Sequence, residues 1–258
     1  MQTVHLGNGI FLFKDAVNFD DAFFNSFMGR MYEFSPPNIP KIQDGSQMVL
    51  TDGGYEYPAS HINTSPIRHT NTIYQGISDE DESFIKSLED AIYTCLVKYC
   101  KSFPVVMETV TWRTRGYFIE YHVGQSIGAH SDCAIAYQPN SIIELNNAPL
   151  HNTLTTSVIL NDDYEGGELR FAPWGISVTP PKGSILIYPS SFSGCHEVSA
   201  ITAGKRFAYL SWFAHGSTSH LPIDSDSSTM ESQYSWVKTL KDDVGYAYQE
   251  TVHVGFID

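Results

Sequence analysis

The stretch "LTTSVILNDDYEGGELRFAP" (residues 154–173) decides the fold. Apolar and polar residues alternate on both sides of a turn rich in Asp and Gly, which is the pattern of two short strands joined by a connection. The same period of two returns at residues 109–121, 184–190 and 205–213. Short strands separated by turns such as "TPPKG" predict an antiparallel sandwich or barrel.

The N-terminal part of the chain has a different period. "SDEDESFIKSLEDAIYTCLVKYCKSF" (residues 78–103) places apolar residues three or four apart behind an acidic first turn, which predicts an amphipathic helix capped by Ser78. A second helix is predicted at residues 15–34 and a third at 228–241, whereas 35–76 is irregular. We expect one domain over residues 1–258, with a helix-rich part (1–108), a β-barrel core (109–215) and a C-terminal extension (216–258).

Composition excludes several classes of function. The net charge of −14 argues against general binding to nucleic acid or to anionic membranes, because phosphate groups need clustered Lys and Arg. The sequence has no apolar run long enough to span a membrane and no recognisable secretion signal. Its four cysteines form no CxxC pair, so we expect reduced thiols and a soluble, cytoplasmic protein. The sequence does not predict an oligomeric state.

One pair of polar residues stands out in the core segment. His130 and Asp132 lie two apart after a glycine-containing turn, so on an extended chain both side chains face one side. By themselves they are also compatible with an exposed turn. Together with His196, which follows the strand at 184–190, they form the two-histidine, one-carboxylate set that leaves three positions on an iron ion open.

Arg206 comes ten residues after His196, at the start of the next predicted strand. A planar guanidinium binds a carboxylate through two parallel hydrogen bonds, so a pocket between metal and Arg206 could hold a small dicarboxylate by both ends. Lys205 would face the other side of a regular strand and is the second choice as an anchor.

The ordered motifs resemble the iron- and 2-oxoglutarate-dependent dioxygenases, and among them the prolyl 4-hydroxylase type. The resemblance runs from about residue 117 to 213 and rests on "YHVGQ", "HSD", "ILND", "GGELRFAP", "PPKGSILIYP", "HEV" and "GKRFAYLSWF". It implies a mainly β fold with flanking helices, in which a double-stranded β-helix (a jelly-roll, cupin-like barrel) is buttressed by the N-terminal helices.

The resemblance also implies a cofactor set and residue roles. His130, Asp132 and His196 would bind Fe(II) as the catalytic metal, and Arg206 would hold the far carboxylate of the cosubstrate 2-oxoglutarate. Tyr121 would lie near the cosubstrate, Thr155 near its distal carboxylate, and Trp212 in the pocket wall, although each of these three also suits an ordinary strand position. O2 would be the oxidant and ascorbate an accessory reductant.

The activity implied is hydroxylation of a C–H bond, with decarboxylation of 2-oxoglutarate to succinate. The first candidate substrate is a prolyl residue in a peptide or protein. Alternatives are a free amino acid or other small metabolite, or a non-catalytic cupin-like protein that binds 2-oxoglutarate and metal. A zinc hydrolase would need a general base, for which Glu197 is the nearest candidate.

Three features depart from the family pattern or remain open. Ile159 stands where the family often has an aromatic residue, which removes one hydroxyl donor to the cosubstrate. The long polar segment from Cys133 to Leu154 is either a flap over the substrate or a surface loop. Cys133 and Cys195 each adjoin a proposed iron ligand and either shape the mouth of the site or are two ordinary thiols.

Overall fold

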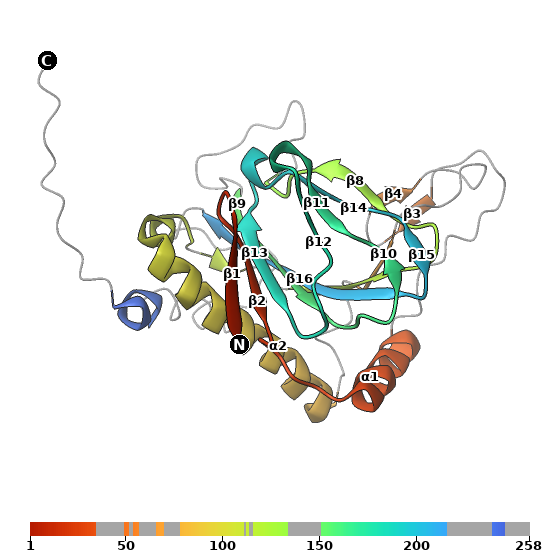
Figure 1. The fold of residues 1–258 in the computed structure, drawn as a ribbon. Coiled ribbons are helices and arrows are strands. Elements are labelled where there is room, and N and C mark those ends of the chain that lie inside the picture. Colours follow the sequence, from red (N-terminus) through yellow and green to blue (C-terminus); the bar gives the residue numbers. More distant parts are fainter. Residues whose placement is uncertain are drawn as a thin grey trace, which may run out of the picture.

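The computed structural model describes residues 1–34, 49–51, 54–56, 66–69, 78–110, 112–113, 116–133, 151–215 and 239–245. Two antiparallel sheets face each other in this part of the chain (Figure 1). We call them the major and the minor sheet. The predicted class, a mainly β fold of double-stranded β-helix type with flanking helices, is confirmed.

The major sheet has eight strands, and its path runs in the order β1-β2-β13-β9-β16-β7-β5, with β6 paired to β16. Its strands are β1 (Gln2–Gly7), β2 (Ile10–Lys14), β5 (Ile67–His69), β6 (Trp112–Arg113), β7 (Tyr117–Tyr121), β9 (His151–Ile159), β13 (Ile185–Pro189) and β16 (Arg206–His215).

The minor sheet has four strands in the order β12-β11-β14-β8. They are β12 (Ile176–Val178), β11 (Leu169–Phe171), β14 (His196–Val198) and β8 (Ile127–His130). Two small ladders accompany the sheets, β10 (Glu165–Gly166) with β15 (Ile201–Ala203) and β3 (Val49–Thr51) with β4 (Gly54–Glu56). Short 3-10 helices lie at η1 (Pro104–Thr109), η3 (Ala172–Trp174) and η4 (Phe192–Gly194).

Strand alternation divides the major sheet into two faces with different partners. Ile119, Ile159 and Leu186 point inward and pack with Leu169 and Phe171 of the minor sheet. On each strand the residues that alternate with these point outward, into a second core that also contains the helices. This separation follows from the period of two, since neighbouring strand residues face opposite sides of a sheet.

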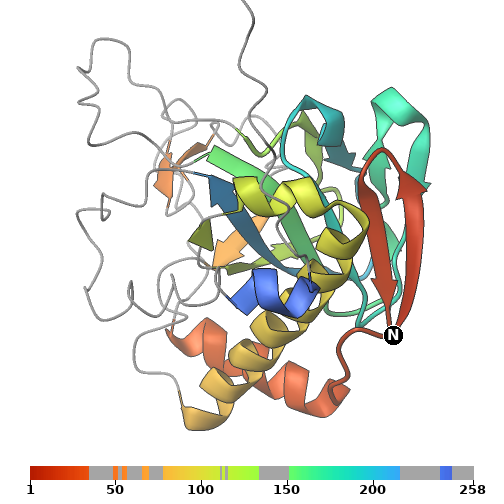
Figure 2. The same cartoon turned by 90° about the vertical axis from the view of Figure 1, so that its left-hand side faces the viewer.

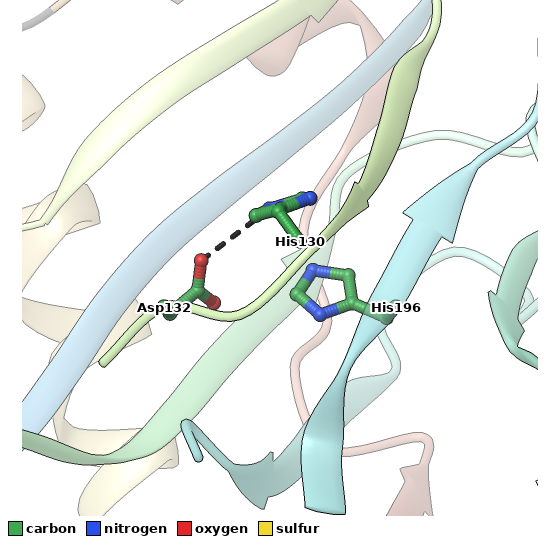
Figure 3. A group of neighbouring side chains, drawn as sticks. All are labelled: His130, Asp132 and His196. Atoms are coloured by element: carbon green, nitrogen blue, oxygen red, sulfur yellow. Dashed lines mark ion pairs between the residues drawn. The ribbon is translucent and has the colours of Figure 1, made fainter. Parts of the chain in front are cut away.

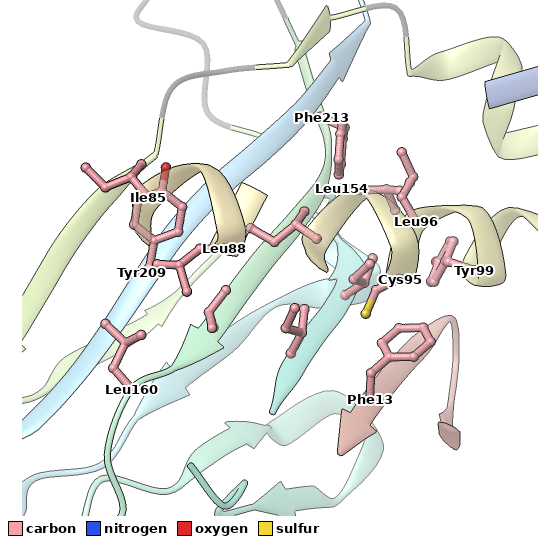
Figure 4. Packing of buried hydrophobic residues seen from close by; sticks show 14 of the residues in the cluster. Phe13, Ile85, Leu88, Cys95, Leu96, Tyr99, Leu154, Leu160, Tyr209 and Phe213 are labelled. Carbon is pink, nitrogen blue, oxygen red and sulfur yellow. The ribbon is translucent and has the colours of Figure 1, made fainter. Parts of the chain in front are cut away.

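Helix α2 (Asp79–Ser102) covers the outer face of the major sheet (Figures 1 and 2). The Ser78 hydroxyl accepts a hydrogen bond from the backbone N–H of Asp81, which confirms the predicted cap. Its apolar stripe packs on residues of β2, β9 and β16, as Figure 4 shows for Leu88, Cys95, Leu154 and Phe213. Burial of a side chain such as Leu88, fully buried here, contributes about 1.5–3 kcal/mol.

Helix α1 (Asp21–Phe34) begins later than the sequence predicts. Asp20 accepts a hydrogen bond from the Phe23 N–H and ends the preceding extended segment, so the helix does not include residues 15–20. Phe27 and Met31 of α1 are buried in the same outer core as α2.

Residues 2–14 lie in the N-terminal part that was expected to be helix-rich, but they are strands rather than a helix. These form the hairpin β1–β2, and β2 extends the major sheet by pairing with β13. The turn "GNG" has positive φ at Gly7 (107°), Asn8 (51°) and Gly9 (76°), a conformation that Gly and Asn adopt at low cost. That turn was the signal for the hairpin.

Two further element predictions need adjustment. The single strand expected at 109–121 is divided between η1, β6 and β7. Of the helix expected at 228–241, only its end lies among the described residues, where 239–244 are helical. None of the helices in the described ranges is both long and apolar enough to cross a membrane.

An ion pair joins α1 to α2. Arg30 donates from Nε and Nη2 to the Asp81 carboxylate at 2.9 and 2.6 Å, and the Asp81 side chain is almost fully buried. The hydrogen bond from Arg30 is the largest cause that lowers the pKa of Asp81 below its ordinary value.

We therefore predict a pH-dependent effect of Arg30→Met. In the unfolded chain Asp81 has an ordinary pKa near 4, and in the folded protein its pKa is lower. The ion pair therefore contributes its full stabilisation above about pH 4, and this stabilisation is lost as the pH falls through the folded pKa. Urea unfolding should show that the free energy of unfolding falls by about 1–3 kcal/mol at pH 7, and that this difference from the wild type becomes smaller toward acid pH. Lys86→Met, which breaks the exposed pair with Asp90, is the control and should change little. A loss that is equal at all pH values would contradict the prediction.

Candidate metal centre

The register of the minor sheet brings two histidines together. β14 pairs antiparallel with β8, and His196 lies directly opposite His130, with ring centroids 4.4 Å apart. Asp132 follows β8 after one residue, and its carboxylate approaches the same point (Figure 3). One ligand atom from each of the three residues lies within 4.8 Å of the others.

Both histidines are oriented by the same local contact. Each ring places Nδ1 near the carbonyl oxygen two residues earlier, Gly128 for His130 (2.8 Å) and Gly194 for His196 (2.9 Å). A carbonyl oxygen only accepts, so Nδ1 carries the proton and Nε2 presents a lone pair to the cluster. At position 194 a Cβ would lie 1.7 Å from the Pro189 oxygen, so this turn accepts only glycine.

The Asp132 carboxylate is held from the other side. Thr155 of β9 donates its hydroxyl to Oδ2 at 2.8 Å, and the same hydroxyl group contacts Ser190 at 2.8 Å. Asn152 donates to the Asp132 backbone oxygen at 2.9 Å. The other carboxylate oxygen is left to face His130, 3.4 Å from its Nε2.

The charge state of the cluster follows from its surroundings. Burial raises the pKa of Asp132, but the neighbouring His130 and His196 rings and the Thr155 hydroxyl together lower it more, and the net pKa is below the ordinary value. Burial lowers the pKa of His196. The cluster therefore offers neutral imidazole and an ionised carboxylate, a donor set that fits a divalent transition metal.

A cavity of about 110 Å³ joins the cluster to Arg206. Its volume is well below the roughly 300–1,000 Å³ of pockets for drug-sized ligands, so it suits a small molecule. Its lining includes the three residues of the cluster together with Tyr121, Tyr188, Arg206 and Trp212.

Arg206 is 2% exposed and has no carboxylate partner in the described part of the chain. Its Nε has no hydrogen-bond acceptor there, and its guanidinium lies over the ring of Tyr121, 5.0 Å from the centroid. Burying a cation without an anion is costly, so the free energy favours an anion in this cavity.

The structure places most of the predicted site residues around this one cavity: His130, Asp132, His196, Arg206, Tyr121 and Trp212. Tyr121 is the cross-strand partner of Arg206. Lys205, the second choice as an anchor, instead reaches Glu120 at 3.1 Å and is not part of the lining.

Thr155 requires a correction. It was expected near the distal carboxylate, and hence near Arg206, but it contacts Asp132. Trp212 is its partner on β16, six residues along the strand from Arg206, which corresponds to roughly 20 Å. The pairing of β9 with β16 decides this position, and the sequence does not show the register.

Sequence reasoning missed three polar residues of the cavity lining, Tyr117, Ser157 and Tyr188. The Tyr188 hydroxyl lies 3.1 Å from His196 Nε2, and burial raises its pKa well above the ordinary value, so it stays protonated. All three residues lie on predicted strands with the inward alternation, which is the signal that could have identified them.

Most of the segment that was predicted to be either a flap or a surface loop lies outside the described residues. Residues 134–150 lie outside the described residues, and Cys133 and Cys195 are free thiols of intermediate exposure.

Comparison with known proteins agrees with this geometry. Residues 116–214 match the family model of the 2OG-Fe(II) oxygenase superfamily. The predicted resemblance is thereby confirmed, because this segment is similar to the 2OG-Fe(II) oxygenase superfamily. The description names 2-oxoglutarate and Fe(II), the cosubstrate and metal that the sequence predicts.

Curated relatives include a PKHD-type hydroxylase of Acinetobacter baumannii, 33% identical over 126 residues (46% of this chain and 52% of that protein). Another PKHD-type hydroxylase, from Alteromonas mediterranea, is 35% identical over 98 residues (37% of this chain and 41% of that protein). The chain thus spans about half, or less, of the length of these relatives.

A solved structure has a similar fold. It is a prolyl hydroxylase from Trichoplax adhaerens in complex with a peptide fragment of the hypoxia inducible factor oxygen degradation domain. The TM-score is 0.51 at 16% sequence identity, and the match covers 81% of this chain and 84% of that one.

We predict that Thr155→Val weakens metal binding about tenfold or more, because Asp132 loses the donor that orients it. Titration with Mn²⁺ measures the effect without redox chemistry. Thr156→Val is the matched control, since Thr156 is equally buried but bonds to Ser211 on the outer face of the sheet. Equal Mn²⁺ affinity in the two variants would contradict the role given to Thr155.

Proposed function

We propose that the chain is an Fe(II)- and 2-oxoglutarate-dependent dioxygenase that hydroxylates a C–H bond, with residues 1–258 acting as one domain. One observation carries the proposal. A three-residue donor set for a divalent metal and a buried arginine without an acid partner among the described residues line the same small cavity. A dicarboxylate that also chelates metal satisfies both ends.

Each residue has a distinct task in this proposal. His130, Asp132 and His196 hold Fe(II), which supplies activation of O2 coupled to decarboxylation of 2-oxoglutarate to succinate. Arg206 clamps the distal carboxylate through two charge-assisted hydrogen bonds. Tyr121 supports the guanidinium from one side, and Trp212 closes the wall of the cavity.

A zinc hydrolase is less well supported. Glu197, the candidate general base, lies 3.7 Å from Arg170 of the neighbouring strand β11 and is not part of the cavity lining. A hydrolase would also leave the buried charge of Arg206 without a function. A non-catalytic protein that binds metal and 2-oxoglutarate has the same geometry, and only turnover separates it from an enzyme.

For the substrate we propose a prolyl residue in a peptide or protein. Support comes from relatives named PKHD-type hydroxylases and from the shared fold with a prolyl hydroxylase whose structure is in complex with a peptide fragment. A free amino acid or another small metabolite is the second candidate. Ascorbate as an accessory reductant stays a prediction.

Anaerobic titration of the full chain with Fe(II) and 2-oxoglutarate tests the chemistry. We expect a weak metal-to-ligand charge-transfer band in the visible that is absent in His130→Ala. Arg206→Met should still bind Fe(II) but need at least about tenfold more 2-oxoglutarate, because a charge-assisted hydrogen bond contributes about 1.5–3 kcal/mol.

Lys205→Met is the control for this titration, because Lys205 is adjacent in sequence but bonds to Glu120 outside the cavity. It should leave the 2-oxoglutarate requirement unchanged. A wild-type protein that forms no band with Fe(II) and 2-oxoglutarate would refute the proposed function.

Incubation with a library of proline-containing peptides, Fe(II), 2-oxoglutarate and O2 tests the substrate. We expect mass spectrometry to find peptides that gain one oxygen atom on a prolyl ring, with one succinate formed for each. Stimulation of succinate formation by free amino acids, with no peptide modified, would replace the prolyl proposal by the second candidate.

A further inference from the structure

Tyr188 of β13 is a buried residue to which the proposed function gives no role. It is 2% exposed and lines the same cavity as Arg206. Its hydroxyl lies 3.1 Å from His196 Nε2, and in the described part of the chain this is its one hydrogen bond.

The direction of this hydrogen bond follows from the other ring nitrogen. His196 Nδ1 donates to the Gly194 carbonyl, so in the neutral ring Nε2 is an acceptor and the Tyr188 O–H donates to it. Nε2 has a single lone pair. A metal ion at the cluster needs that lone pair, and therefore metal binding and this hydrogen bond exclude each other.

Metal binding then leaves a buried hydroxyl without an acceptor, which costs free energy unless a new acceptor arrives. On β9 the residue directly opposite Tyr188 is Thr155, whose hydroxyl is already engaged with Asp132 and Ser190. Arg206 serves the opposite end of the cavity. The oxygen atoms of a metal-chelating keto acid arrive at the end where the Tyr188 hydroxyl lies.

We propose that Tyr188 is a positioning residue with two alternating partners, an inference that rests on the proposed function. Without metal, its hydroxyl donates a hydrogen bond to His196 Nε2. With metal bound, the hydroxyl donates to an oxygen atom at the metal-bound end of 2-oxoglutarate.

The substitution Tyr188→Phe separates the two partners because it should move two affinities in opposite directions. Mn²⁺ alone should bind about two- to tenfold more tightly, since His196 no longer has to give up a hydrogen bond. With metal present, 2-oxoglutarate should bind about tenfold or more weakly, since a donor to a charged ligand is lost.

The charge-transfer band under anaerobic conditions gives a third readout. A hydrogen bond to the chelating oxygen lowers the energy of the acceptor orbital of the keto acid, so Tyr188→Phe should shift the band to shorter wavelength. Incorporation of 3-fluorotyrosine at position 188, which keeps the ring and makes the hydroxyl a stronger donor, should shift it to longer wavelength. The second variant keeps the test intact if Tyr188→Phe does not fold.

Tyr99→Phe is the matched control. Tyr99 is equally buried, but its hydroxyl donates to Gly9 and lies outside the cavity. This variant should lose stability and leave both affinities and the band unchanged.

Two results would overturn the inference. Metal and 2-oxoglutarate affinities that fall together in Tyr188→Phe would make the hydroxyl a simple support for His196. An unmoved band and unchanged affinities would leave it without a role in ligand binding. Neither result touches the proposed function, which fails only if the wild-type protein forms no complex with Fe(II) and 2-oxoglutarate.

Discussion

The candidate site depends on the antiparallel pairing of β14 with β8. This ladder sets His196 directly opposite His130, and Asp132 follows at the end of β8. A shift of one residue would turn one histidine to the outside of the sheet, because neighbouring residues of a strand face opposite sides. Register in the minor sheet therefore decides whether a metal can bind at all. The turns that carry the Gly128 and Gly194 carbonyls then orient the two rings.

The second part of the site comes from the facing sheet. Arg206 begins β16, and its inward orientation brings a permanent charge to the far end of a cavity that begins at the minor sheet. The distance from the three-residue cluster to Arg206 thus determines the length of ligand that can reach from metal to guanidinium. Arg206 has no acid partner among the described residues, and this is informative because a protein interior does not retain an uncompensated charge without cost. Structural arginines such as Arg30 show the contrast, since that residue has its carboxylate in Asp81.

The outer face of the major sheet explains the rest of the architecture. Its outward residues, among them Val158, Tyr209 and Phe213, are apolar and would be exposed without α1 and α2. The helices therefore stabilise the strands whose opposite side carries Arg206, Tyr188 and Thr155. The alternation along β9, β13 and β16 thus supplies apolar residues to the outer core and site residues to the cavity. A substitution on the outer face can therefore disturb the site by shifting the strand that carries a site residue.

The sequence by itself determined the elements with strong periodicity and the identity of the metal-ligand candidates and of Arg206. These signals depend only on neighbouring residues or on spacing along the chain, so a single sequence contains them. They are the alternation after residue 109, the capped helix at α2 and the ordered set His130, Asp132, His196 and Arg206. Tertiary structure decided which strands are neighbours. It moved Thr155 from the proposed distal carboxylate to Asp132, added Tyr188 to the cavity and extended the major sheet by the β1–β2 hairpin. These facts depend on pairing between segments far apart in sequence, and register is set by packing across the whole barrel rather than by either strand alone.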